Sequence, residues 1–310
     1  MQNNTTHKQE LHCEYLSRTE GLVSAAIRDK VVLAVGTGAG SYMLEKLVRC
    51  ASPAEMRLVD FDRVEWVNLC RTSFGASDVG NFKAEALARR IEDANPFVRV
   101  VPHAVDLCAL GDADLTALCA GVDLIIAGTD SFPAQALLNR LSQRYNIPTV
   151  FIGIHAGAQG GRVIWSLPGE TACYRCVAAE RYTQFDHAGA VNTDLRGAHG
   201  VLPDIQFIDM VALKITLALL DRGQNSAMGR FYAAMNGRNE VVVRCAPDYE
   251  YGTQLWDALL SDLPTEPKPF AEEIKEQILF AMDTIWLQTE RVASCPDCGE
   301  NGARVARAAN

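Results

Sequence analysis

The residues with the clearest chemical pattern form a glycine-rich turn, Gly36-Thr-Gly38-Ala-Gly40, which follows an apolar run typical of a buried strand. Because glycine has no Cβ, backbone N–H groups in such a turn can approach a phosphate closely, and a helix that begins there adds the positive end of its dipole. Asp60 stands 20 residues beyond Gly40, at the end of the next apolar run, where a carboxylate can accept a ribose hydroxyl. The pattern predicts a nucleotide site. The alternative is a tight strand-to-helix turn that binds nothing.

Three charged residues farther along the chain favour a triphosphate over a nicotinamide cofactor. Arg71 and Lys83 can neutralise phosphate oxygens, and Asp130 can hold a magnesium ion. Thr129-Asp130-Ser131 directly follows an apolar run, and open α/β sheets bind ligands at the carboxyl ends of their strands. Taken singly, each has an ordinary alternative: a solvated surface charge for Arg71 and Lys83, and a helix cap for Asp130. The prediction therefore depends on the three together.

Four of the ten cysteines form two pairs, Cys173-x-x-Cys176 and Cys295-x-x-Cys298. Paired thiols with this spacing are typical of a tetrahedral zinc site. Four thiolates leave no open position on the metal, so we expect a structural zinc ion that joins distant parts of the chain. A redox pair and unrelated buried thiols are the alternatives.

The remaining cysteines carry weaker signals. Cys50, Cys108 and Cys119 fall in apolar or helical contexts, and we interpret them as small core residues. Cys70 lies inside the nucleotide motif and is interpreted as a packing residue. For Cys245 we expect a buried, unreactive thiol.

Alternating strands and helices must position these residues. Apolar runs predict strands, and periodic runs between them predict helices with short connections. The expected strands are 30–35, 56–60, 98–102, 123–128 and 149–153, and the expected helices are 41–50, 83–94 and 133–145. This alternation predicts an α/β fold with a mostly parallel sheet covered on both faces. Beyond residue 157 the pattern changes, and we expect strands at 162–166 and 240–244, a loop over 183–200 and a helix over 206–220.

Together these motifs resemble the ThiF/MoeB/HesA family, the bacterial relatives of the ubiquitin-activating enzymes. The resemblance runs from about residue 29 to residue 298 and is interrupted after 244. It rests on the glycine turn, Asp60-Phe-Asp62, Asn68-Leu-Cys-Arg71, Gly80-x-x-Lys83, Thr129-Asp130 and the two cysteine pairs. It implies a Rossmann-like ATP-binding fold with a mixed, mostly parallel sheet, followed by an antiparallel extension and a four-cysteine zinc site.

Members of that family bind MgATP, adenylate the C-terminal glycine carboxylate of a ubiquitin-like or sulfur-carrier protein, and release pyrophosphate. By this resemblance Asp60 would bind the ribose and Asp130 the magnesium ion. The phosphates would contact Asn68, Arg71 and Lys83. The complete set of residues expected at the nucleotide is Gly36, Gly38, Gly40, Asp60, Asp62, Asn68, Arg71, Lys83, Thr129 and Asp130.

The sequence departs from the family pattern in three places. Ser41 stands where the fingerprint has its third glycine, and we expect it to fit at a helix start. Many members carry a cysteine between the first cysteine pair and the following helix, where it takes the activated carboxylate, but residues 177–244 contain none. Family enzymes also tend to supply an arginine from a partner subunit's N-terminus to the ATP phosphates. Arg18 is the nearest match, Arg28 competes with it, and a solvated arginine without this role is the alternative. The family is usually homodimeric, with helix 206–220 as the contact we expect.

Composition and charge exclude several functions. The 29 basic and 38 acidic residues give a net charge of −9, which argues against sequence-independent nucleic-acid binding. The most apolar helical run, 210–220, is shorter than the roughly 20 residues that cross a membrane, and the polar start lacks an export signal. We therefore expect a cytoplasmic protein that binds neither nucleic acid nor membranes. Ten acidic residues and two lysines gather in 248–290, where a helix over 271–282 is either merely solvated or part of a docking surface for a basic protein partner.

We expect an N-terminal arm over 1–28 and one adenylation domain over 29–310, with a nucleotide-binding half at 29–156 and an extension at 157–310. The extension would contain a crossover loop at 177–200, an acidic insertion at 245–285 and the cysteine pairs. The leading hypothesis is an ATP-dependent adenylyltransferase that acts on the C-terminal glycine carboxylate of a small protein. Adenylation of a peptide, a small molecule or a tRNA base, an NAD-dependent oxidoreductase, and an inactive scaffold with the same fold are the alternatives.

Overall fold

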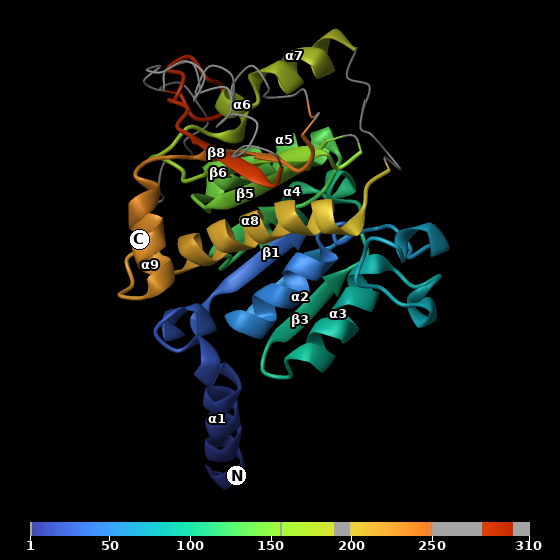
Figure 1. Cartoon of the computed structure of the whole chain (residues 1–310), viewed down its shortest axis with the longest axis vertical. Coiled ribbons are helices and arrows are strands. Elements are labelled where there is room, and N and C mark those ends of the chain that lie inside the picture. Colours follow the sequence, from blue (N-terminus) through green and yellow to red (C-terminus); the bar gives the residue numbers. More distant parts are fainter. Residues whose placement is uncertain (1, 156, 189–198, 248, 250–280, 300–310) are drawn as a thin grey trace, which may run out of the picture.

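One mixed sheet runs through the computed structural model, which describes residues 2–155, 157–188, 199–247, 249 and 281–299 (Figure 1). Within those residues, the sheet has eight strands in the order β3-β2-β1-β4-β5-β6-β7-β8. The strands are β1 (Val31–Val35), β2 (Glu55–Val59), β3 (Arg99–His103), β4 (Leu124–Ala127), β5 (Thr149–Ile154), β6 (Gly160–Ser166), β7 (Glu240–Arg244) and β8 (Asp283–Leu287).

The first five strands pair in parallel, with β2 and β3 on one side of β1 and with β4 and β5 on the other. The direction in which the chain adds strands therefore reverses between β1 and β4. Open α/β sheets bind ligands outside the carboxyl ends of the strands at such a reversal. The glycine turn follows β1 and Asp130 follows β4, so both lie at this point of the sheet.

The last three strands extend the same sheet in the antiparallel sense, β6 beside β5 and β8 at the edge. The mixed, mostly parallel sheet with an antiparallel extension that the sequence predicts is thus confirmed. The α/β fold class is confirmed with it.

Helices cover both faces of the sheet. They are α1 (Gln2–Leu16), α2 (Ser41–Cys50), α3 (Lys83–Ala94), α4 (Asp112–Cys119), α5 (Phe132–Tyr145), α6 (Tyr174–Val177), α7 (Ala179–His187), α8 (Leu202–Leu220) and α9 (Ala227–Met235). The helices α2, α3, α8 and α9 pack on one face, and α4 to α7 pack on the other. Figure 1 shows α2, α3 and α8 in front of the strands, with α1 extending away from them.

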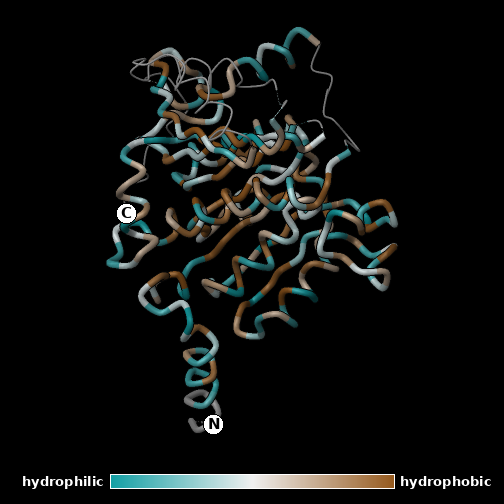
Figure 2. The backbone as a smooth tube through the Cα atoms, in the orientation of Figure 1, coloured by the Kyte–Doolittle hydropathy of each residue, from teal (hydrophilic) through white to brown (hydrophobic). Residues whose placement is uncertain are grey.

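The alternation of side chains along β1 supplies both cores. Val32 and Ala34 belong to the apolar cluster under α2 and α8, whereas Leu33 and Val35 belong to the cluster under α5. Since successive side chains of a strand point to opposite faces, a strand covered on both sides must be apolar at every position. In Figure 2 the tube is mostly brown along β1, which lies as in Figure 1.

The start of α5 explains how the chain presents Asp130. The Ser131 hydroxyl caps the helix by accepting a hydrogen bond from the Ala134 N–H, and Pro133 occupies the first turn, where its missing N–H costs nothing. The helix ends at Tyr145, and the capping residue Asn146 adopts the left-handed conformation. Asp130 is therefore held between the end of β4 and a fixed helix start.

Most of the predicted elements agree with the structure to within a few residues, and helices 41–50 and 83–94 and strand 240–244 agree at both ends. The predicted loop over 183–200 is wrong at its beginning, because residues 183–187 complete α7. Tyr182 buries its ring against Phe132 and so fixes this helix, a contact that the local sequence does not reveal. The predicted helix 271–282 falls mostly outside the described residues.

Two predictions about thiols are wrong. Cys108 and Cys70 are exposed rather than buried in the core or packed inside the nucleotide motif. Cys108 lies in a short 3-10 helix, Leu107–Ala109, whose single turn buries Leu107 and turns the thiol outward. Cys119 and Cys245 are buried as predicted, and Cys50 packs partly buried against the core.

No helix among the described residues is both long enough and apolar enough to cross a membrane.

Candidate functional site

A large cleft opens at the carboxyl ends of β1, β2 and β4, with a volume of about 1310 Å³. The structure brings all ten residues expected at the nucleotide to its wall: Gly36, Gly38, Gly40, Asp60, Asp62, Asn68, Arg71, Lys83, Thr129 and Asp130. They come from five separate stretches of the chain, residues 36–40, 60–62, 68–71, 83 and 129–130, which the fold places side by side. Their assembly is a property of the fold, since no two of the segments are adjacent in sequence.

The glycine turn is tightly packed against the loop that carries Asp130. Gly36 has a φ of +86°, and a Cβ at this position would lie 2.6 Å from the backbone nitrogen of Thr129. Only glycine combines that conformation with so close an approach. The turns that follow β1 and β4 are therefore in backbone contact, and the position of one fixes the position of the other.

Ser41 replaces the third glycine of the fingerprint without opening the turn. Its side chain is fully buried, and its hydroxyl accepts a hydrogen bond of 2.9 Å from the Ser73 N–H. That bond connects the first residue of α2 to the segment that carries Arg71. The expectation that serine fits at this helix start is confirmed.

Asp60 is oriented by three donors. Its Oδ2 accepts from the Thr37 N–H at 2.8 Å and from the Thr37 hydroxyl at 3.0 Å, while Oδ1 accepts from the Asp62 N–H at 2.9 Å. Burial raises the pKa of Asp60, and the Thr37 N–H and the Lys83 ammonium oppose that rise. A carboxylate so oriented is suited to accept hydroxyl groups, as a ribose provides.

The cationic side of the cleft is formed by Lys83 and Arg71. The Lys83 Nζ lies 2.9 Å from Asp62 Oδ2 and 3.9 Å from the point where a Cβ on Gly38 would stand. Arg71 is half-buried and follows a short 3-10 helix, Trp66–Asn68. Asn68 caps that helix by accepting from the Glu65 N–H at 2.9 Å, which leaves the amide NH₂ as the group a phosphate oxygen can bind.

Asp130 is exposed to the cleft and makes no hydrogen bond or ion pair among the residues that the structure describes. Its neighbour Thr129 is fixed on both sides. The Thr129 hydroxyl accepts from the Ser131 N–H at 3.1 Å, and the Thr129 carbonyl accepts from Gln135 Nε2 at 2.8 Å. A carboxylate that faces the cleft beside the glycine turn has the oxygen donors that magnesium prefers.

Arg18 does not join this group. It is exposed on a short 3-10 helix, Ser17–Thr19, and it does not line the cleft of its own chain. Its competitor Arg28 also lies outside the cleft, where its guanidinium contacts the Cys13 sulfur at 3.6 Å. If Arg18 contacts ATP phosphates, it must therefore do so in the cleft of another copy of the chain.

The cleft is also lined by residues that the sequence pattern did not assign to the site: Cys108, Gln135, His155, Arg162, Arg181 and Tyr249. His155 and Cys108 follow β5 and β3, so the rule that selected Asp60 and Asp130 could have found them. Tyr249 is hydrogen-bonded to His155, and its ring fills the space that a Cβ on Gly160 would take. Burial lowers the pKa of His155 to about 4, so this imidazole is neutral at physiological pH.

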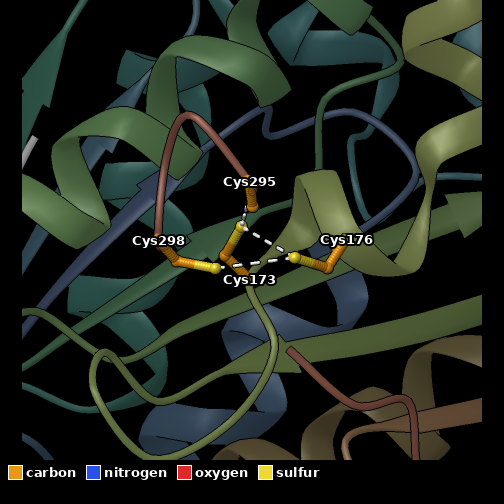
Figure 3. Close-up of side chains that lie close together, drawn as sticks. All are labelled: Cys173, Cys176, Cys295 and Cys298. Atoms are coloured by element: carbon orange, nitrogen blue, oxygen red, sulfur yellow. Dashed lines mark hydrogen bonds between the residues drawn. The ribbon is translucent and has the colours of Figure 1, made fainter. Parts of the chain in front are cut away.

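The four paired cysteines form a second site, where their side chains point toward one another (Figure 3). All four thiols are buried, none is in a disulfide, and their sulfur atoms lie within 4.8 Å of one another. The distances are 3.9 Å between Cys173 and Cys176, 3.7 Å between Cys173 and Cys295, and 3.5 Å between Cys176 and Cys298. A regular tetrahedron of sulfurs around zinc has edges of about 3.8 Å, given Zn–S bonds of about 2.3 Å. The residues therefore fit a zinc ion.

The surroundings of the cluster support the same assignment. The Cys173 thiol donates to Cys176, which lowers the pKa of Cys176 to about 5. The Val292 N–H also points at the Cys176 sulfur, at 3.5 Å. Asn139 Nδ2 lies 3.7 Å from the Cys173 sulfur and donates to Asp297 Oδ2 at 2.8 Å. Donors directed at sulfur are the outer contacts that stabilise thiolate ligands of a metal.

A family model described as "ThiF family" matches residues 16–249, which is most of the chain. The chain belongs to the ThiF family. The resemblance predicted from the glycine turn, the polar motifs and the cysteine pairs is thereby confirmed.

Relatives of this ThiF-family chain include proteins named ubiquitin-like modifier-activating enzyme 5. The protein of Drosophila ananassae is 32% identical over 268 residues, which cover 81% of this chain and 65% of the relative. The protein of Drosophila willistoni is 31% identical over 267 residues, 80% of this chain and 63% of the relative, and that of Drosophila virilis is 32% identical over 160 residues, 48% and 40%. The chain thus spans between 40% and 65% of the length of these relatives.

Among solved structures, the ThiF-family chain is similar in fold to E. coli MccB. The complex of MccB with MccA-N7isoASN has a TM-score of 0.60 at 15% identity, covering 88% of this chain and 68% of MccB. MccB with ATP has a TM-score of 0.59 at 16% identity, with the same coverage. PaaA is similar at a TM-score of 0.54 and 18% identity, over 71% of this chain and 70% of PaaA.

Proposed function

We propose that this protein is an ATP-dependent adenylyltransferase that activates the C-terminal carboxylate of a small protein or peptide. The observation that carries the proposal is the meeting, in one cleft, of the ribose-type carboxylate Asp60, the cations Arg71 and Lys83, and the exposed carboxylate Asp130 around a glycine turn. A nicotinamide dinucleotide needs the first of these but requires no exposed carboxylate for a metal ion. A triphosphate with its magnesium ion uses all of them.

The reaction requires two anions to approach each other. An oxygen of the substrate carboxylate attacks the α-phosphorus of ATP, the new C–O–P bond forms, and the bond from the α-phosphorus to the bridging oxygen breaks, so that pyrophosphate leaves with its electron pair. Arg71 and Lys83 bind the phosphate oxygens before this step and offset the repulsion. Magnesium, when bound at Asp130, supplies positive charge to the pyrophosphate leaving group. No side-chain nucleophile is needed.

The relatives support the proposed class of substrate. Those named ubiquitin-like modifier-activating enzyme 5 support a ubiquitin-like protein as the substrate, and MccB, solved with MccA, supports a related use of the fold. We propose that this substrate is a ubiquitin-like or sulfur-carrier protein that ends in glycine. The cleft extends past the nucleotide residues to His155 and Arg162, which leaves room for an extended chain end beside the glycine turn. We take adenylation of a small molecule or a tRNA base as the second choice.

We expect that the activated carboxylate does not form a thioester with a cysteine of the crossover segment. Residues 177–244 contain no cysteine. Cys245, the next thiol in sequence, is buried in the core, and burial raises its pKa to about 12. We propose that the acyl-adenylate passes to a nucleophile outside these residues.

Pyrophosphate–ATP exchange tests the proposed function. The probe is a ubiquitin-like or sulfur-carrier protein ending in glycine that is encoded beside this gene, and exchange should depend on its presence. Arg71→Ala and Asp130→Ala should each lower the exchange rate by about 100-fold or more, as the loss of a charge-stabilising group does in other enzymes. Arg49→Ala and Asp93→Ala change exposed residues outside the cleft and serve as matched controls. Normal exchange by the Arg71 and Asp130 variants, or binding of NAD in place of ATP, would refute the proposal.

The proposed homodimer and the role of Arg18 can be tested together. If Arg18 reaches the cleft of a partner copy, Arg18→Ala and Asp130→Ala proteins should each exchange poorly alone. Mixed dimers should recover activity, because one of their two clefts then has Asp130 from one copy and Arg18 from the other. A mixture that stays inactive, with dimers shown to have exchanged subunits, would assign Arg18 to the solvated surface.

A further inference from the structure

Gln135 lies between the two sites described above. Its side chain is 2% exposed, on the second turn of α5, and two groups share its amide oxygen. The Tyr174 hydroxyl donates to Oε1 at 2.7 Å, and Arg181 Nη1 donates to the same oxygen at 2.5 Å. On its other side, Gln135 Nε2 donates to the Thr129 carbonyl at 2.8 Å. The amide thus connects the segment after Cys173 to the residue before Asp130.

The orientation of this amide is determined by its neighbours. A guanidinium only donates hydrogen bonds and a carbonyl only accepts them, so the oxygen must face Arg181 and the NH₂ group must face Thr129. Arg181 Nη1 also donates to the Tyr174 hydroxyl at 2.8 Å, which leaves that hydroxyl to donate to Gln135. Every group in this buried set is satisfied in one arrangement, and such networks hold their members in fixed positions.

A second residue of α5 continues the connection to the cysteines. Asn139 lies one helical turn beyond Gln135 and is fully buried. Its Oδ1 accepts from the Tyr174 N–H at 2.9 Å, and its Nδ2 donates to Asp297 of the second cysteine pair at 2.8 Å. The two amides on one face of α5 therefore reach both cysteine pairs at one end and the Thr129 carbonyl at the other.

We propose that Gln135 is a positioning residue through which the four-cysteine cluster fixes the loop that carries Asp130. Asp130 has no side-chain partner of its own among the described residues, so its direction is decided by the backbone on either side. Gly36 supports that backbone from the glycine turn, and Gln135 supports it from the cysteine side. Folding of the cysteine pairs around a metal positions Tyr174 and Arg181. These two side chains orient the Gln135 amide, which in turn holds the Thr129 carbonyl. The role of Asp130 as magnesium ligand rests on the proposed function, whereas the hydrogen-bonded path does not.

Two variants each remove a different hydrogen bond of the Gln135 side chain. Gln135→Glu keeps an oxygen that accepts from Arg181 and Tyr174, but it loses the N–H that donates to the Thr129 carbonyl. Tyr174→Phe keeps the ring, which stacks on Phe151, and loses one of the two donors to Gln135. Tyr182→Phe is the matched control, because the Tyr182 hydroxyl lies in the same region, is buried and has no hydrogen-bond partner among the described residues.

The first measurement needs no nucleotide. Amide hydrogen exchange of the peptide covering 128–135 should speed up in Gln135→Glu and in Tyr174→Phe, while both variants keep as much zinc as the parent. Stripping the metal from the parent should speed up exchange in the same peptide, and stripping it from Gln135→Glu should add little there. The proposal would be overturned if metal removal left hydrogen exchange in this peptide unchanged. It would also be overturned if Tyr182→Phe sped up that exchange as much as the two variants do.

The second measurement uses pyrophosphate exchange. A displaced Asp130 should raise the magnesium concentration that gives half the maximal rate by about fivefold, the factor expected for one net hydrogen bond of about 1 kcal/mol. The affinity for ATP without magnesium should stay as in the parent, which a general loss of structure would not allow. If the protein proves to exchange no pyrophosphate, the proposed function fails but the hydrogen-exchange result still decides the path. If pyrophosphate exchange occurs and Gln135→Glu needs the same magnesium concentration for half the maximal rate as the parent, the positioning role is wrong while the proposed function remains.

Discussion

Lys83 and Asp62 form an ion pair at the entrance of the glycine turn, with Nζ 2.9 Å from Oδ2. The lysine side chain is only 14% exposed, whereas the aspartate side chain is 53% exposed. The pair holds the ammonium beside Gly38 and directs it at the place where phosphates would bind. A triphosphate that binds there must therefore compete with Asp62 for the Lys83 ammonium.

Replacing Asp62 should strengthen nucleotide binding. In Asp62→Asn the competing charge is gone and Lys83 is available to the phosphates. Since exposed ion pairs contribute about 0.2–1 kcal/mol, the Kd for ATP should fall by only about 1.4-fold to fivefold at low salt. Titration calorimetry at two salt concentrations measures this, and the gain should shrink as salt rises. Weaker binding in Asp62→Asn would mean that Asp62 itself contacts the nucleotide.

Gly36 should tolerate no side chain. In Gly36→Ala the new Cβ meets the Thr129 backbone at 2.6 Å, and the residue keeps a left-handed φ. Backbone strain and overpacking together should lower the free energy of unfolding by at least about 2 kcal/mol. Gly40→Ala is the control for stability, because its φ of −72° is ordinary and nothing lies within 4 Å of its Cβ position. Chemical denaturation of both variants makes the comparison, and equal stabilities would contradict the close packing of the two turns.

The site was predictable from sequence where its residues follow strands. Asp60 ends an apolar run and Asp130 closely follows another, and a parallel sheet places such ends at one edge, so local patterns were enough to bring them together. The cysteine pairs were predictable for a similar reason, since their spacing is itself the geometry of a metal knuckle. Lys83 was expected at the phosphates from its charge, whereas Asn68 was added by family resemblance.

What sequence could not supply are contacts between side chains that are remote in the chain. Gln135 reads as an ordinary helical residue, and its role appears only because Tyr174 and Arg181 arrive beside it from another segment. Residues 183–187 were expected to be loop because they are polar, and the packing of Tyr182 on Phe132 overrides that signal. The thiol of Cys108 was placed in the core because its neighbours are apolar, but one 3-10 turn exposes it.

The four-cysteine cluster should bind one zinc ion per chain and lose it on substitution. Cys298→Ser removes one of four ligands, and the zinc content measured by elemental analysis should fall well below one per chain. Because a structural metal contributes its binding energy to folding, the variant should also unfold at a lower denaturant concentration. Cys108→Ser, which changes an exposed thiol outside the cluster, should keep the metal. A parent protein purified without metal and unaffected by added zinc would argue for a redox pair instead.

Asp209 should make the stability of the protein depend on pH. This residue of α8 borders the cleft, its side chain is fully buried, and neither carboxyl oxygen has a hydrogen-bond partner among the residues the structure describes. Burial raises the pKa of Asp209 to about 8, and the Lys46 ammonium on α2 only partly opposes that rise. The folded protein therefore keeps a proton at pH values where the unfolded chain, with an ordinary pKa of about 3.9, has released it.

The sign of the effect follows from that difference in bound protons. Between about pH 4 and pH 8 the unfolded state binds fewer protons than the folded state, so the free energy of unfolding falls as pH rises through this window and levels off above it. Asp209→Asn cannot ionise and should lack this fall. The variant should match the parent near pH 4 and exceed its stability by a few kcal/mol near pH 8, in urea denaturation at several pH values. The exposed Asp93→Asn should follow the parent throughout. Parallel curves for Asp209→Asn and the parent would show that a group in the cleft already satisfies the Asp209 carboxyl.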